Sequence, residues 1–146
     1  MHSRIPDELL RKTILVVDDL ADNRHAITTL LMADGFDNVL EAASGAEVLS
    51  LLDSGQAIDL VLLDILMPGI NGRQVLDCMK SRAALKNIPV IMVTGVNDVE
   101  SVFECIEQGA TDYLIKPVDE VVLRASVRAG LSAKTIRDFK KRRYAR

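Results

Sequence analysis

The fold of this chain is decided by residues 58–64, Ile58-Asp59-Leu60-Val61-Leu62-Leu63-Asp64, an almost unbroken apolar run that ends in a carboxylate. A strand covered on both faces has this near-continuous apolar character, whereas a strand with one solvated face alternates. Three other runs have the same form and end in reactive polar residues: residues 14–17 before Asp18 and Asp19, residues 90–93 before Thr94, and residues 113–115 before Lys116. Together the four runs predict buried strands whose carboxyl ends share one site.

Amphipathic helices separate the predicted strands, which we place near residues 13–18, 37–41, 58–63, 88–94 and 111–116. The second strand is short and mixed in composition, which indicates an edge position. One helix carries an apolar stripe at the i, i+3, i+4 and i+7 positions, formed by Val99, Val102, Phe103 and Ile106. Residues at this spacing share one helix face, so we expect the stripe to pack on the core.

Strands that alternate with helices imply right-handed crossovers and an α/β fold. We expect a doubly wound five-stranded parallel sheet in the flavodoxin-like order 2-1-3-4-5, with helices on both faces. In that order the ligand crevice lies at the carboxyl ends of the first and third strands. These strands end in Asp18-Asp19 and Asp64, so the fold and the chemistry indicate the same place.

The composition is that of one globular domain, with 146 residues of which 49% are hydrophobic. No apolar stretch is long enough to cross a bilayer and the N-terminus has no signal core, so we expect a cytoplasmic protein. Cys78 and Cys105 lie in helical patterns among apolar neighbours, and we interpret both as small buried hydrophobes rather than zinc ligands. His2 and His25 are isolated and are interpreted as surface residues.

The charge of the chain is uneven along its length. The formal net charge is −3, but the residues from Lys134 onward carry +6, so the remainder carries −9. An acidic body argues against nucleic-acid binding. We expect an N-terminal extension over residues 1–11, the domain over residues 12–132, and a basic helical extension or linker over residues 133–146. No glycine after Gly130 and no proline interrupts that last helix, which can continue through Ile136 and Phe139.

Three carboxylates in one crevice repel one another unless a cation joins them. Asp18, Asp19 and Asp64 suit Mg²⁺, which prefers few carboxylates and keeps several waters, with Mn²⁺ as a substitute. One carboxylate can then act as a nucleophile toward a phosphoryl group, while Lys116 and Thr94 interact with phosphate oxygens. Each motif alone is more often a cap, turn or loop than a site. Their joint occurrence at successive strand ends favours a site.

The same residues carry a resemblance to a known family. The matching segments are Ile14-Leu15-Val16-Val17-Asp18-Asp19, Asp64-Ile65-Leu66-Met67-Pro68-Gly69, Val93-Thr94-Gly95 and Gly109-Ala110-Thr111-Asp112-Tyr113-Leu114-Ile115-Lys116-Pro117. Across about residues 12–132 the sequence resembles the receiver domain of two-component response regulators, the CheY-like superfamily.

The resemblance implies a role for each matching residue. Asp64 matches the aspartate that accepts a phosphoryl group from a histidine kinase or phosphotransfer protein. At the metal site, Asp19 and Asp64 match direct ligands, and Asp18 matches the neighbouring acid that usually holds a metal-bound water. The third protein ligand is a backbone carbonyl two residues past the acceptor, here that of Leu66. Thr94 and Tyr113 match the switch residues and Lys116 the phosphate-pairing lysine. The peptide bond between Lys116 and Pro117 is expected to be cis.

The resemblance also implies a signalling mechanism. Phosphorylation at Asp64 would draw in Thr94, make room for Tyr113 and reshape the face formed by the fourth helix, the fifth strand and the fifth helix of the receiver. The signal would pass from a single-domain regulator to an output partner, or to an output domain beyond residue 146 in a longer chain, of a second-messenger cyclase type. A homodimer is a further expected partner. Leu66 and Val96 are apolar where fast-dephosphorylating receivers tend to carry polar groups, so we expect a long-lived phosphoryl group.

Other classes of protein remain as alternatives. A stand-alone phosphohydrolase with an aspartyl-phosphate intermediate needs a second acid two residues after the nucleophile, and Leu66 stands there. A receiver fold that acts as an interaction module without phosphate is the other alternative. A nucleotide-binding module lacks support because no glycine-rich loop follows the first strand. We therefore expect a signalling domain rather than an enzyme, with catalysis limited to its own phosphorylation and dephosphorylation.

Overall fold

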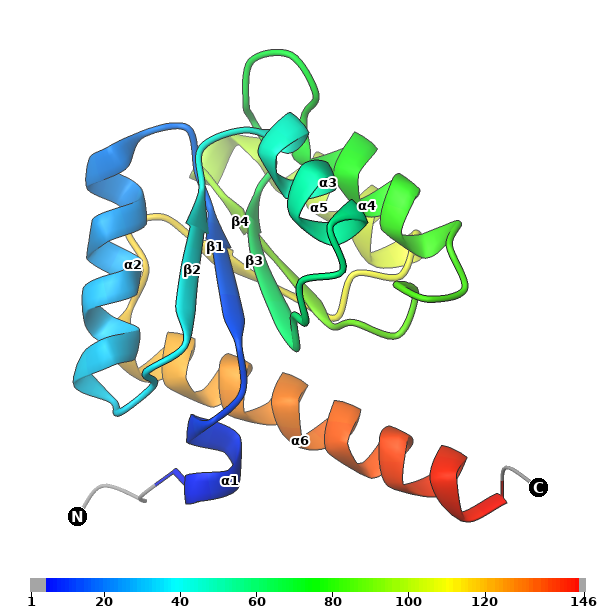
Figure 1. Cartoon of the computed structure of the whole chain (residues 1–146). Helices are drawn as coiled ribbons and strands as arrows, with labels where there is room; N and C mark the ends of the chain where they lie inside the picture. Colours follow the sequence, from blue (N-terminus) through cyan, green and yellow to red (C-terminus); the bar gives the residue numbers. More distant parts are fainter. Residues whose placement is uncertain (1–4, 145–146) are drawn as a thin grey trace.

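One parallel sheet forms the centre of the protein. The computed structural model describes the backbone of residues 5–144 and the side chains of residues 5–98 and 100–134. Five strands lie in the order β2-β1-β3-β4-β5 (Figure 1). Their bounds are Ile14–Val17 for β1, Val39–Ala42 for β2, Leu60–Asp64 for β3, Val90–Thr94 for β4 and Asp112–Ile115 for β5. The predicted flavodoxin-like order and the edge position of the second strand are both confirmed.

Helices cover both faces of this sheet. Their bounds are Asp7–Leu10 for α1, Ala21–Ala33 for α2, Gly45–Asp53 for α3, Gly72–Lys80 for α4, Val99–Glu107 for α5 and Glu120–Tyr144 for α6, with a 3-10 turn η1 at Val96–Asp98. The helices α3, α4 and α5 cover one face, and α1, α2 and α6 cover the other (Figure 1).

Each central strand contributes to two hydrophobic cores. In β1, Leu15 and Val17 pack toward α3 and α4, while Ile14 and Val16 pack toward α2 and α6. Successive side chains of a strand point to opposite faces, so a strand buried on both sides must be apolar at every position. This requirement accounts for the unbroken apolar runs and leaves polar residues only where the strands end.

The N-terminal helix was not predicted from the sequence. Ile5 and Leu9 are 4% and 3% exposed and join the core beneath α2 and α6. The segment lies at the end of the sheet opposite to the carboxyl ends of the strands (Figure 1). Its four helical residues are too few to leave a periodic apolar pattern in the sequence.

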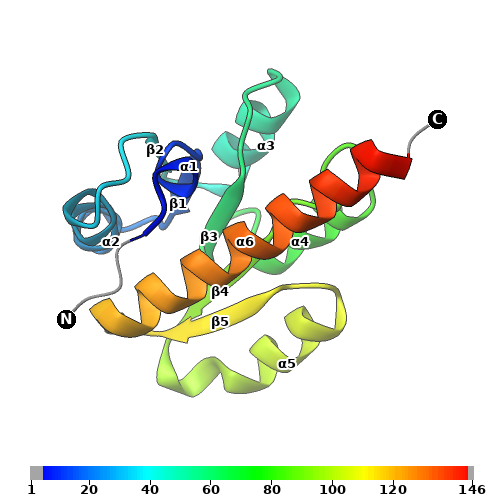
Figure 2. The same ribbon diagram turned by 90° about the horizontal axis from the view of Figure 1, so that it is seen from below.

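The last helix continues past Gly130 without interruption, as the sequence predicts. Helix α6 contains 25 residues and runs diagonally beneath the sheet before it projects from the body (Figure 2). The side chains of Ile136, Phe139 and the basic cluster at residues 140–143 lie outside the described residues, as does His2. Within the described chain, no helix has both the length and the apolarity that a membrane crossing requires.

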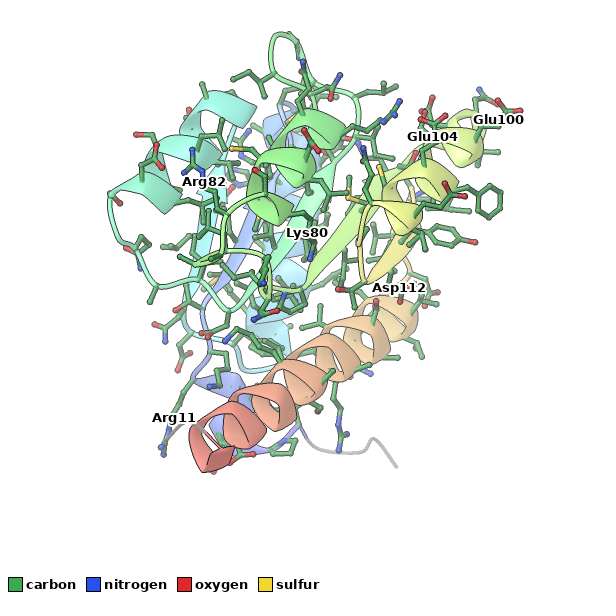
Figure 3. All side chains as sticks on the ribbon, turned by 90° about the vertical axis from the view of Figure 1, so that its right-hand side faces the viewer. Arg11, Lys80, Arg82, Glu100, Glu104 and Asp112 are labelled. Atoms are coloured by element: carbon green, nitrogen blue, oxygen red, sulfur yellow. The ribbon has the colours of Figure 1, made fainter. Side chains whose placement is uncertain are left out.

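The predicted apolar stripe on α5 is wrong in part. Val102 is fully buried, but Phe103 and Ile106 are 60% and 38% exposed. Cys105 is buried in place of Ile106, and the outer surface of α5 carries Glu100 and Glu104 (Figure 3). The helix packs on β4 near the edge of the sheet, so the sheet covers only part of its surface. Of the two cysteines, Cys105 is buried as predicted and Cys78 is partly exposed.

Gly72 is the glycine on which the position of Asp64 depends most directly. A Cβ atom at residue 72 would lie 2.2 Å from the backbone oxygen of Asp64, so the strand end must move to admit it. We expect Gly72→Ala to lower the free energy of unfolding by about 2 kcal/mol or more, as overpacking does. Chemical denaturation would measure the loss.

Gly95→Ala is the matched control for this substitution. A Cβ atom at residue 95 would meet only a carboxylate oxygen of Asp98 at 3.5 Å, an ordinary contact. We expect its free energy of unfolding to stay within about 1 kcal/mol of wild type. Equal stability of the two variants would contradict the packing argument.

Candidate metal site at the carboxyl edge of the sheet

The strand register brings the predicted acids together. Val17 pairs with Leu63 in the parallel ladder, so Asp18 and Asp64 leave neighbouring strands side by side. The carboxylates of Asp18, Asp19 and Asp64 each offer an oxygen atom, and these atoms lie within 4.8 Å of one another. They are the one group of this kind found among the described residues. We call these three residues the acid pocket.

Burial makes the acid pocket costly for negative charge. Asp18 is 1% exposed and Asp64 is 4% exposed, whereas Asp19 is more open to solvent. Burial, followed by the repulsion of Asp18, raises the pKa of Asp64 to about 6, and the attraction of Lys116 only partly offsets these effects. The pocket therefore holds more negative charge than its own surroundings neutralise.

Lys116 is the cation that the chain itself supplies. Its Nζ lies 2.9 Å from Asp18 Oδ2 and 3.2 Å from Asp64 Oδ1. Burial opposes the charge on this lysine, but the contacts with Asp18 and Asp64 outweigh it and raise the pKa of the ammonium group. The backbone nitrogen of Lys116 donates to the carbonyl of Thr94 at 2.8 Å, and the following bond to Pro117 is cis, as expected.

The acid pocket fits a hard divalent cation. Its donors are carboxylate oxygens, which Mg²⁺ prefers. The buried Oδ2 atom of Asp18 accepts no hydrogen bond of good geometry, although Lys116 lies close to it. Three carboxylates and one ammonium group leave a formal charge of −2 when all are ionised, so a divalent cation would balance the pocket.

The two predicted switch residues differ in burial, since Thr94 is buried and Tyr113 is partly exposed. Thr94 is 1% exposed at the end of β4, and its hydroxyl donates to the carbonyl of Gly95 at 3.2 Å. Tyr113 lies on β5 and is 37% exposed, so the structure does not bring its ring into the acid pocket. Two apolar side chains in the loops after β3 and β4 are exposed, Leu66 at 60% and Val96 at 67%.

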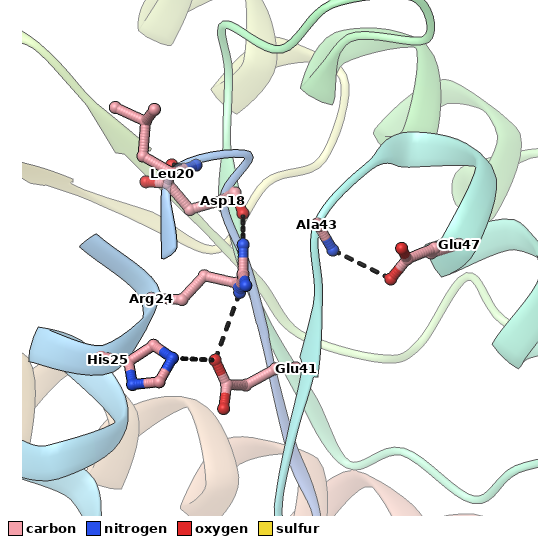
Figure 4. Close-up of polar contacts among 7 residues, drawn as sticks. All are labelled: Asp18, Leu20, Arg24, His25, Glu41, Ala43 and Glu47. Carbon is pink, nitrogen blue, oxygen red and sulfur yellow. Dashed lines mark hydrogen bonds and ion pairs between the residues drawn. The ribbon is translucent and has the colours of Figure 1, made fainter. Parts of the chain in front are cut away.

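Sequence reasoning missed Arg24 and strand residue Glu41. The Nη1 atom of Arg24 donates to the backbone carbonyl of Asp18 at 2.8 Å, and its Nε donates to Oε1 of Glu41 at 3.2 Å (Figure 4). His25 is 69% exposed, and its Nε2 lies 4.0 Å from the same Glu41 oxygen. An arginine in the first turn of a helix gives no signal of this contact unless the pairing of β1 with β2 is known.

Comparison with known sequences identifies close relatives. The family model of the response regulator receiver domain matches residues 14–128. The chain is 35% identical to the chemotaxis protein CheY of Pseudomonas aeruginosa over 114 residues, which cover 78% of this chain and 91% of that protein. It is 36% identical to the DNA-binding response regulator MtrA of Mycobacterium tuberculosis over 124 residues, 85% of this chain but only 52% of MtrA.

Comparison with solved structures finds proteins of the same fold. A crystal structure described as adenylate cyclase from Rhodopirellula baltica superposes with a TM-score of 0.78 at 25% sequence identity. The match covers 90% of this chain and 96% of that one.

Replacing Asp64 should change how stability depends on pH. The pKa of Asp64 is raised from 3.8 to about 6, so between these values the folded protein binds the proton more tightly than the unfolded chain. Wild-type stability therefore falls as pH rises through this window. We expect Asp64→Asn to nearly match wild type at about pH 3, below the unfolded pKa, and to be about 1–3 kcal/mol more stable above about pH 7 without divalent cations. Urea unfolding with a chelator present measures this difference, and an Asn variant less stable than wild type at neutral pH would refute it.

Proposed function

This chain belongs to the response regulator receiver domain family, and from that membership we propose that it is a phospho-accepting receiver whose acceptor is Asp64. The phosphoryl donor is a histidine kinase or a phosphotransfer protein, and the site of action is the cytoplasm. The observation that carries the proposal is the acid pocket itself. A buried carboxylate with a raised pKa lies beside two further acids and within 3.2 Å of a lysine.

The reaction is a transfer between a nitrogen and an oxygen atom. A carboxylate oxygen of Asp64 attacks the phosphorus of a phosphohistidine, the bond from phosphorus to nitrogen breaks, and the imidazole leaves. Asp18, Asp19, Asp64 and the backbone carbonyl of Leu66 are the proposed Mg²⁺ ligands. Mg²⁺ bound there supplies positive charge that offsets the charge of the phosphoryl oxygens.

Lys116 changes partners during this transfer. Before transfer its ammonium group lies between Asp18 and Asp64. The new phosphoryl group brings additional oxygen atoms and charge to Asp64, which makes it the stronger partner for the lysine. Thr94, at the end of the neighbouring strand, donates its hydroxyl to a phosphoryl oxygen in place of the Gly95 carbonyl that it contacts now.

Signalling follows from a shift between two conformations. The movement of Thr94 toward the phosphoryl group frees space that the exposed ring of Tyr113 then occupies. The face formed by α5, β5 and α6 changes shape as a result and contacts an output partner. The phosphoryl group favours the second conformation only through the contacts that it makes better there.

The proposed division of the chain assigns residues 1–11 to an N-terminal extension, residues 12–132 to the receiver and residues 133–146 to a linker. Helix α6 continues through that last segment and supports its role as a connection. The output we favour is a second-messenger cyclase joined in a longer chain, in view of the likeness to the Rhodopirellula protein. A homodimer is the second way in which the signal could leave the domain.

Intact-mass spectrometry after incubation with a small phosphodonor and Mg²⁺ tests the acceptor. We expect one phosphoryl adduct on the wild-type protein, because Asp64 is the buried nucleophile of the pocket. The adduct should be absent without Mg²⁺ and absent from Asp64→Asn.

The alternatives give different results in the same experiment. A folded wild-type protein that takes no phosphoryl group from either a small donor or a histidine kinase would contradict the proposal and favour an interaction module without phosphate. Sustained release of phosphate with many turnovers would favour a phosphohydrolase instead.

The exposed apolar side chains of Leu66 and Val96 predict a long-lived phosphoryl group. Neither can orient an attacking water molecule, and they stand two residues after Asp64 and two residues after Thr94. We expect wild-type label to persist well beyond seconds in Mg²⁺, and Val96→Glu to lose it about tenfold faster or more, since a positioned general base contributes ~10² or more. Val96→Leu is the matched control and should decay like wild type. Loss of the wild-type label within seconds would overturn this prediction.

A further inference from the structure

Arg24 connects helix α2 with strands β1 and β2 next to the acid pocket. It lies in the first turn of α2, and its side chain is 16% exposed. One arm of the guanidinium group binds the backbone carbonyl of Asp18 at the end of β1, and the other binds Glu41 in β2 (Figure 4). The side chain thus links the loop after β1 to helix α2 and to strand β2.

The hydrogen bond from Arg24 to the Asp18 carbonyl also restrains the backbone of Asp19. That carbonyl and the amide nitrogen of Asp19 belong to one planar peptide unit. A hydrogen bond to the carbonyl therefore restrains the orientation of the unit that leads from one pocket carboxylate to the next. The carboxylate of Asp18 has its own restraints, because Oδ1 accepts the Leu20 amide at 2.9 Å and Oδ2 lies near Lys116.

Asp19 depends more on its backbone than the other two acids do. It is the most exposed member of the pocket, and among the described contacts no hydrogen bond or ion pair holds its carboxylate. The position of this side chain therefore follows from the orientation of the peptide unit that Arg24 restrains.

Charge and geometry predict opposite effects of removing Arg24. The arginine places a positive charge near the acid pocket, and Glu41 is its counterion. If only charge mattered, removing Arg24 would strengthen the binding of a cation. If Arg24 orients the carboxylates, removing it would weaken that binding.

We propose that Arg24, oriented by Glu41, is a positioning residue for divalent-cation binding in the acid pocket. It holds the peptide between Asp18 and Asp19 so that their carboxylates converge on one point. This inference rests on the proposed function, because it takes both aspartates as cation ligands. Loss of a contact that orients a metal ligand typically weakens metal binding about 10–100-fold.

The test is an Mg²⁺ titration of the unphosphorylated full chain, followed by the amide signals of Asp19 and Asp64 in two-dimensional NMR. We expect the dissociation constant to rise about tenfold in Arg24→Ala. Arg24→Lys should give a smaller rise, since an ammonium group keeps the charge but lacks the planar fork that reaches both partners. Glu41→Ala should also raise the constant, because it removes the acceptor that orients the arginine through Nε.

Arg82→Ala is the matched control. Arg82 also pairs with a carboxylate, Asp53, but it follows the C-terminal end of α4, whereas Gly72 at the other end of that helix lies against Asp64. We expect it to leave the Mg²⁺ dissociation constant unchanged. Thermal unfolding of each variant would show whether the protein is folded. If Arg24→Ala does not fold, the Mg²⁺ dissociation constant of Arg24→Lys tests the inference.

A second measurement separates positioning from a general loss of structure. The Mg²⁺ concentration that gives half-maximal phosphorylation should rise in the Arg24 variants, while the rate at saturating Mg²⁺ should stay near that of wild type. Wild-type or tighter Mg²⁺ binding by a folded Arg24 variant would overturn the inference and leave the proposed function intact. Failure of the wild-type protein to bind Mg²⁺ at all would overturn both.

Discussion

The crowding of negative charge at one edge of the sheet is the constraint on which the rest of the structure depends. Parallel pairing of β1 with β3 leaves Asp18 and Asp64 adjacent, nearly out of contact with water and with too little positive charge to balance them. Burying like charges side by side raises the free energy of the folded state. The strands behind the acids are apolar on both faces, which supplies the stability that this edge does not. Lys116 offsets part of the charge and remains available to other partners.

Much of this arrangement could be predicted from the sequence, because strands that are buried on both sides have a strong signature. The run from Ile58 to Leu63 has no alternation, and its polar end must coincide with the end of the strand. Once the strand order is 2-1-3-4-5, the ends of neighbouring strands must meet, and the acids, Thr94 and Lys116 fall at one edge without any knowledge of side-chain contacts. The cis bond before Pro117 was expected from the family resemblance and is present.

The parts that could not be predicted depend on tertiary contacts between weak local signals. On α5, the spacing of Phe103 and Ile106 is compatible with burial, but a helix near the edge of the sheet is only partly covered by it. Cys105 was expected to be buried, yet the interpretation of the stripe did not include it. The short helix α1 has too few residues for a periodic pattern, and Ile5 and Leu9 are buried because they pack with apolar residues of α2 and α6. Arg24 and Glu41 meet across two elements, which no single-sequence pattern describes.

The position of α6 relative to the acid pocket has a consequence for how this domain can be combined with others. The pocket opens at the carboxyl ends of the strands, whereas α1 and the far end of α6 lie at the opposite pole (Figure 1). A protein docked over Asp64 and a segment joined to α6 would lie at different ends of the molecule and would not compete for space. A reporter or catalytic module joined after α6 would therefore leave the opening over Asp64 uncovered.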